Sequence, residues 1–79
     1  MFVVKVYNLD PSSYKVKNVN VKVFNSLEES QKFIVEEHYK IAFDNDDTDL
    51  ELDEFLSENS FDSIVDELYD TFEFEIIEE

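Results

Sequence analysis

The apolar residues of this chain follow two different spacings, and the change between them most constrains the fold. In two regions they alternate with polar residues, as in Val19, Val21 and Val23 and again in Phe72, Phe74 and Ile76. Alternation with period two is typical of a strand with one buried face. Between these regions the spacing is that of an amphipathic helix, with apolar residues at positions 61, 64, 65, 68 and 69.

Six elements are expected from these patterns. A strand at residues 2–8, a turn at 10–13 and a half-buried strand at 15–24 form a hairpin. Ser26 and Glu29 form a capping box that opens a helix to about residue 42. A short helix at 50–57, a helix at 61–70 and a last strand at 72–76 follow. We predict one compact α+β domain over residues 1–79, in the order β-β-α-α-α-β. It has a three-stranded antiparallel sheet with helices packed on one face.

The charged residues are divided unevenly along the chain. The net charge is -15, and all six basic residues are Lys. Residues 1–40 hold the six Lys and five acids, whereas residues 41–79 hold sixteen acids and no base. On the helix at 26–42 we expect ion pairs four residues apart, Glu28–Lys32, Lys32–Glu36 and Glu36–Lys40. Such asymmetry points to interaction with a basic partner rather than to the fold.

Several residue types are absent, and each absence excludes a class of function. Without Cys there is no disulfide or thiolate metal site, and without Gly there is no glycine-rich phosphate loop. Without Arg there is no bidentate fork for phosphate or guanine, so direct nucleic-acid binding is not expected. No apolar stretch is long enough to span a membrane, and the N-terminal apolar run is too short for a signal peptide. We expect a soluble, cytoplasmic protein, a monomer or homodimer, with no cofactor.

The unpaired acids of the second half are the candidate contact residues for a basic partner. Acids four apart on the helix at 61–70 would lie ~6 Å from their neighbours, and acids on one strand face would lie ~7 Å apart. Duplex DNA carries about one charge per 1.7 Å of its axis, so such an array resembles a phosphate backbone. The predicted partner-binding residues are Asp44, Asp46, Asp47, Asp49, Glu51, Asp53, Asp62, Asp66, Asp70, Glu73 and Glu75.

Other functions are also compatible with an acidic chain of this size. A solvated acidic surface would serve solubility alone, and an acidic adaptor would dock on a basic protein unrelated to nucleic acid. A calcium loop starting at Asp47 has Leu52 where the turn needs Gly, and one starting at Asp44 ends on Phe55. No metal site is therefore predicted, although loose binding of divalent cations stays an alternative. His38 has no partner for metal binding or catalysis, so we expect it to pack on a helix face and expect no enzyme activity.

In size, charge and the acidic stripe of Asp62, Asp66 and Asp70, the chain resembles a class of phage proteins. These are the small acidic DNA-mimic inhibitors that bacteriophages encode against host defences, of the anti-CRISPR and anti-restriction type. They share no single fold or motif, so the resemblance carries over no individual residue. It implies a stoichiometric inhibitor, acting in the host bacterial cytoplasm, that occupies the basic nucleic-acid groove of a CRISPR effector or restriction-type nuclease.

Overall fold

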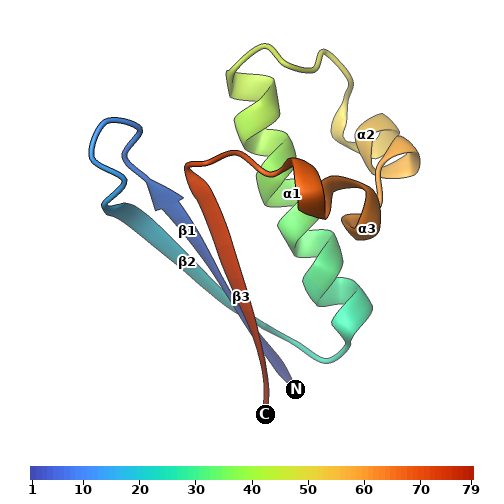
Figure 1. Cartoon of the computed structure of the whole chain (residues 1–79). Coiled ribbons are helices and arrows are strands. Elements are labelled where there is room, and N and C mark those ends of the chain that lie inside the picture. Colours follow the sequence, from blue (N-terminus) through green and yellow to red (C-terminus); the bar gives the residue numbers. More distant parts are fainter.

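The computed structural model describes all residues 1–79 and has the predicted order of elements (Figure 1). The strands are β1 (Phe2–Leu9), β2 (Val16–Phe24) and β3 (Phe72–Glu78). The helices are α1 (Leu27–Asp44), α2 (Leu52–Glu58) and the one-turn α3 (Phe61–Ile64), which continues into a 3-10 turn, η1 (Val65–Glu67). The sheet order is β2-β1-β3 and both pairings are antiparallel, so the predicted α+β fold class is confirmed.

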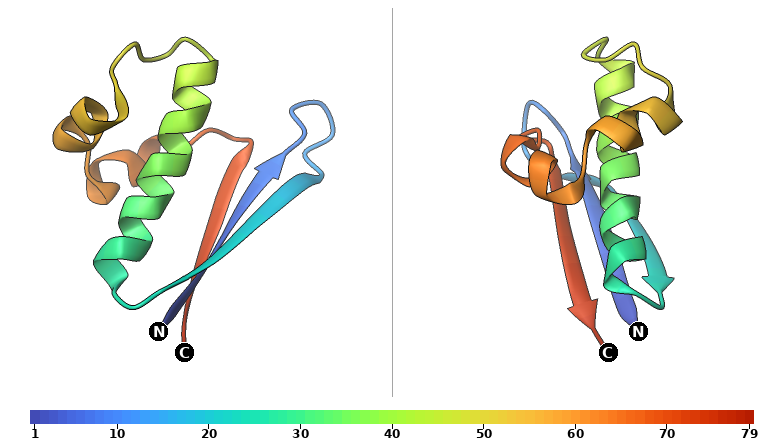
Figure 2. Two further views of the ribbon diagram at one scale, coloured as in Figure 1. Left: turned by 180° about the vertical axis from the view of Figure 1, so that it is seen from behind. Right: turned by 90° about the vertical axis from the view of Figure 1, so that its right-hand side faces the viewer.

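All the helices lie on one side of the sheet, and the other side is open (Figures 1 and 2). The central strand β1 places Val4 and Val6, both fully buried, on the helix side. In register with Val4 are Lys22 on β2 and Ile76 on β3. Because side chains alternate across a strand, the residues between these positions face outward. We call this uncovered side the open face; from β1 it carries Val3, Lys5 and Tyr7.

Helix α1 is covered by apolar side chains on two sides. Toward the sheet, Phe33 and Ile34 form a cluster with Val4, Val6 and Phe72. On another side of the helix, Val35 forms a second cluster with Phe55 of α2 and Ile64 of α3. Ser26 caps the start of the helix, and its hydroxyl accepts a hydrogen bond of 3.2 Å from the Glu29 N–H. The return bond from the Glu29 carboxylate is not made, so only half of the predicted capping box is present.

The prediction that β2 buries its valine side is wrong. Val19, Val21 and Val23 lie on the open face and are 43%, 54% and 55% exposed. The polar side of β2 faces the helix layer instead, because Asn20 and Lys22 are the residues in register with the buried valines of β1. Nδ2 of Asn20 donates to Oε1 of Glu37 at 3.1 Å, and Nζ of Lys22 lies 5.1 Å from the ring centroid of Phe33.

The prediction of one regular helix at 61–70 is also wrong. The α-helical part ends at Ile64, η1 ends at Glu67, and Leu68 is extended with ψ of 146°. The chain then turns into β3, with the Phe72 N–H donating to the Tyr69 carbonyl at 3.0 Å. A helix carrying acids every four residues and no bases is destabilised by their repulsion. Little free energy is therefore lost when the α-helix ends at Ile64.

The predicted ion pairs of α1 do not form either. The structure has one salt bridge, between Lys40 and Glu37 at 2.9 Å. Glu37 is nearly buried and also accepts the bond from Asn20. Leu27 and Leu52, the first residues of α1 and α2, are 45% and 37% exposed.

We expect the packing of α1 on the sheet to dominate stability. Ile34→Ala should lower the free energy of unfolding by about 2–5 kcal/mol, because it removes a fully buried side chain from the cluster that joins helix and sheet. Urea denaturation followed by circular dichroism measures this. Leu27→Ala, at a 45% exposed position of the same helix, is the matched control and should change stability by less than about 0.5 kcal/mol. Equal losses in the two variants would contradict the assignment of the core.

Candidate anionic interface

The segment from the end of α1 to the start of β3 carries only negative charge. Residues 44–70 hold twelve acids and no base, and we call this segment the acidic lobe. It comprises the connector after α1, α2, α3 and η1, which lie together beside α1 (Figures 1 and 2). All twelve acids are exposed, including three that were not among the predicted residues, Glu54, Glu58 and Glu67. These three acids belong to the same stretch of sequence without a basic residue, and this signal could have identified them as candidate contact residues.

Nine of the eleven predicted contact residues belong to the acidic lobe. They are Asp44, Asp46, Asp47, Asp49, Glu51, Asp53, Asp62, Asp66 and Asp70, and every one is exposed. Asp62 lies on α3 and Asp66 on η1, while Asp70 follows the extended Leu68. These three acids therefore do not form the regular helical stripe that the sequence suggested.

The other two predicted residues, Glu73 and Glu75, lie on the open face of the sheet. They are in register with Tyr7 and Lys5 of β1, and the Tyr7 hydroxyl donates to Oε1 of Glu75 at 3.4 Å. The open face is the side of the sheet without helices (Figure 2). The predicted residues are thus divided between two surfaces rather than gathered on one.

No acid of the acidic lobe is neutralised within the protein. The single salt bridge joins two residues of α1, and the six Lys all lie at or before position 40. Asp53 and Glu54 in the first turn of α2 and Asp62 in the first turn of α3 do have a local role. They interact favourably with the positive ends of their helices, by about 0.3–1 kcal/mol each. The remaining acids of the lobe have no basic neighbour that would account for them.

Two tyrosines fasten the acidic lobe to α1 and to itself. The hydroxyl of Tyr39 on α1 donates to the carbonyl of Leu50 at 2.7 Å. The hydroxyl of Tyr69 donates to the carboxylate of Asp47 and so joins the connector to the segment after η1. Burial, together with the hydrogen bond and charge of Asp47, raises the pKa of Tyr69 to about 12. These bonds hold the connector in place although it has no regular secondary structure.

His38 lies among aromatic rings between the sheet and the acidic lobe. Its ring stacks on Tyr69 at 5.3 Å and lies 6.2 Å from the ring of Phe55 and 6.3 Å from that of Phe72. Nδ1 is buried without a hydrogen-bond partner. Burial lowers the pKa of His38, and the negative charge of Glu67 partly opposes this. The neutral imidazole therefore packs as an aromatic side chain.

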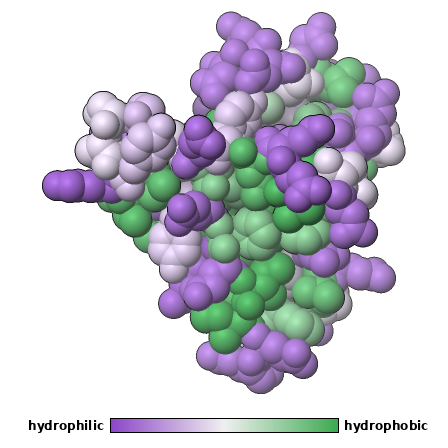
Figure 3. Space-filling view, in the orientation of Figure 1, coloured by the Kyte–Doolittle hydropathy of each residue, from purple (hydrophilic) through white to green (hydrophobic).

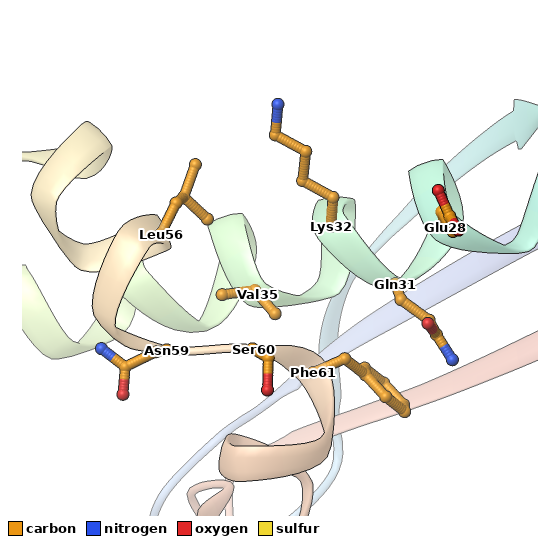
Figure 4. Close-up of a pocket in the computed structure, with 8 residues that line it drawn as sticks. All are labelled: Glu28, Gln31, Lys32, Val35, Leu56, Asn59, Ser60 and Phe61. Atoms are coloured by element: carbon orange, nitrogen blue, oxygen red, sulfur yellow. The ribbon is translucent and has the colours of Figure 1, made fainter.

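One hollow of the surface lies where the acidic lobe meets α1, and apolar residues and a helix cap form part of its lining. An open groove of ≈ 240 Å³ lies between α1 and the α2–α3 junction (Figure 4). Val35, Leu56 and Phe61 supply its apolar lining, and Lys32 extends away from it. The Ser60 hydroxyl at its edge accepts from the Ser63 N–H and serves as a helix cap. No three His, Cys, Asp or Glu residues are grouped so as to hold a metal ion.

Comparison with protein-family models, with curated proteins and with solved structures finds no match to this chain. Among its helices, none has both the length and the apolar character needed to cross a bilayer. The acidic lobe is therefore the feature of the chain from which a function is inferred.

The buried, neutral His38 predicts a pH dependence of stability. Its pKa is lower in the folded protein than in the unfolded chain, where it is about 6.5. The unfolded state then binds more protons below that pH, so the free energy of unfolding should fall as the pH drops from about 8 to 5.5. The comparison to make is urea denaturation of the protein and of His38→Phe at several pH values. The decrease should be smaller in the variant, and parallel curves for the two would contradict a buried neutral imidazole.

Proposed function

We propose that this protein is a non-enzymatic inhibitor that mimics nucleic acid, and that its acidic lobe enters the basic groove of a nucleic-acid-binding protein. One observation carries the proposal: twelve exposed acids in residues 44–70, without a base among them and without an ion pair. Asp47 accepts a hydrogen bond from Tyr69, and the other eleven carboxylates are free to accept hydrogen bonds from Lys or Arg of a partner. Such charge-assisted bonds are about twice as strong as neutral ones.

The amount of charge argues against a role in solubility alone. A net charge of about 2–8 keeps a small domain in solution, whereas this chain has -15. The excess is concentrated in the acidic lobe, where mutual repulsion of like charges opposes folding. A charge that destabilises the fold and exceeds what solubility needs is explained by a basic partner.

The size of the acidic lobe suits a short piece of duplex. Twelve phosphates belong to about six base pairs, or ~20 Å of duplex axis. The whole molecule measures 35 × 32 × 18 Å, so a surface of this length fits on it. Because Asp62, Asp66 and Asp70 are not on one regular helix, the mimicry proposed here depends on charge density and not on a copy of the spacing along one DNA strand.

The class of partner follows from the resemblance to phage-encoded inhibitors. We propose a host defence protein that binds DNA or RNA, such as a CRISPR effector or a restriction-type nuclease, in a bacterial cytoplasm. Association should be fast and salt-sensitive, because opposite charges steer the encounter and salt screens them. An acidic adaptor would use the same acidic lobe on a basic protein unrelated to nucleic acid, and competition with DNA separates the two.

Two double variants with equal charge change test which surface binds. Asp62→Asn with Asp66→Asn alters the acidic lobe, and Glu73→Gln with Glu75→Gln alters the open face. Partners captured from bacterial lysate on the immobilised protein are identified by mass spectrometry and their affinities measured. Exposed charge contacts contribute about 0.2–1 kcal/mol each, so the lobe variant should bind roughly 2- to 30-fold more weakly, and the open-face variant should bind nearly as the unmodified protein does.

The same captured partner is then challenged with duplex DNA, with RNA and with increasing NaCl. The proposal expects displacement by one of the nucleic acids and loss of affinity with salt. A partner displaced by salt but by neither nucleic acid would indicate the adaptor. Affinity unchanged by salt would overturn a charge-based mechanism altogether.

A further inference from the structure

Strand β2 is the one edge of the molecule that carries no negative charge. Residues 11–27 hold three Lys, at positions 15, 17 and 22, and no acid, within a chain of net charge -15. The strand is nine residues long and pairs only with β1, so its outer backbone groups have no partner in the sheet. All of its residues except Phe24 are exposed. Two copies of this chain can therefore approach most closely along β2.

The exposed side chains of β2 are apolar on one face and polar on the other. Val19, Val21 and Val23 lie on the open face, beside Val3 of β1 and, in the same row, Ile77 of β3. Asn18, Asn20 and Lys22 lie on the helix side. Figure 3 views the molecule from the side of β3, where hydrophobic surface lies in the middle of the molecule between hydrophilic borders.

We propose that a second copy of this chain pairs antiparallel with β2, giving a dimer with a continuous six-stranded sheet. A two-fold axis perpendicular to the sheet keeps the open faces of both copies on the same side. Pairing the whole of Val16–Phe24 with itself places the axis at Asn20, the middle residue of the strand. Val19 then lies opposite Val21 of the other copy, and Lys22 lies opposite Asn18. No Lys faces a Lys, so the pairing avoids like charges directly opposite one another.

The other edge strand is a poorer match for β2. A β3 of the second copy, lying in the same sheet orientation, would put Glu73 and Glu75 beside the valines of the open face. It would also put the apolar Phe74 and Ile76 beside Asn20 and Lys22. Self-pairing of β2 instead places valine beside valine and polar beside polar residues. It also closes on itself, as two-fold interfaces do, whereas β2–β3 pairing would extend into a fibre.

The dimer interface does not include the acidic lobe. The helices α2 and α3 pack on α1 and not on β2, and they lie in the layer on one side of the sheet (Figures 1 and 2). Pairing along β2 uses the backbone groups of the sheet edge, so the acidic lobe of each copy stays free to bind. Because two bodies of charge -15 still repel one another, dimerisation should strengthen with NaCl. Binding through the acidic lobe should weaken with NaCl, so failure of one proposal is distinguishable from failure of the other.

Sedimentation equilibrium over a range of protein and NaCl concentrations tests the dimer. We expect a monomer–dimer equilibrium that shifts to dimer by about tenfold or more between low and high salt. Val21→Glu should weaken it by about tenfold or more, while Leu27→Glu, with the same charge change at a similarly exposed position on α1, should not. A monomer under all conditions would overturn the proposal, as expected if the Lys residues of this edge serve to prevent pairing. Association that weakens with salt would also overturn it, and would indicate contact of an acidic lobe with β2.

The register has its own test, since the chain has no Cys. In Asn20→Cys the two introduced thiols lie directly opposite each other, with Cβ atoms about 4.5–5.5 Å apart, near the range that a disulfide joins. In Asn18→Cys each thiol is four residues from the other, or ~13 Å along the strand. Mild oxidation followed by non-reducing electrophoresis should give a covalent dimer for the first variant only. Equal cross-linking of the two, or none in either, would overturn the proposed pairing.

Discussion

The whole structure depends on α1 packing apolar side chains in two directions at once. Phe33 and Ile34 pack on the sheet, and Val35 packs on Phe55 and Ile64 of α2 and α3. The first contact joins the helix to the strands, and the second holds α2 and α3 against the helix. With thirteen buried residues in 79, the protein has little apolar packing to spare. It nevertheless maintains a lobe whose charges repel one another. Packing on α1 and the contact of Phe61 with Phe74 of β3 hold that lobe in place.

The order of elements could be predicted from the sequence because each change of apolar spacing marks a change of structure. The orientation of β2 could not. A helix is about 10–12 Å across and strands lie about 4.8 Å apart, so one helix covers little more than two strands. The edge strand is left with no face that must be buried, and its valines, which alternate as in a half-buried strand, turn outward. The pairing with Val4 and Val6 of β1 decides its orientation, and this contact is not local in sequence.

The candidate site could likewise be predicted from the sequence only in part. Exposure of all eleven predicted acids could be expected, because unpaired carboxylates stay solvated. Their separation into an acidic lobe and an open face could not, because it depends on which side of β3 faces α1. Phe72, at the start of β3, is 3% exposed and belongs to the cluster with Phe33 and Ile34. Glu73 and Glu75 are thereby directed to the opposite side. The end of the α-helix at Ile64 could not be predicted either. The apolar spacing of a helix continues through Leu68, whereas the α-helical backbone does not.

We propose that the acids of the acidic lobe serve a partner and oppose the fold. The most direct test is the free energy of unfolding, measured by urea denaturation at low and high NaCl, of the protein and of a variant with Asp46, Asp49, Asp66 and Asp70 changed to Asn. These four acids make no ion pair and do not lie in the first turn of α2 or α3. The variant should be more stable at low salt, and the difference should shrink as salt screens the repulsion. A less stable variant would show that the fold itself requires these charges, and would contradict the account.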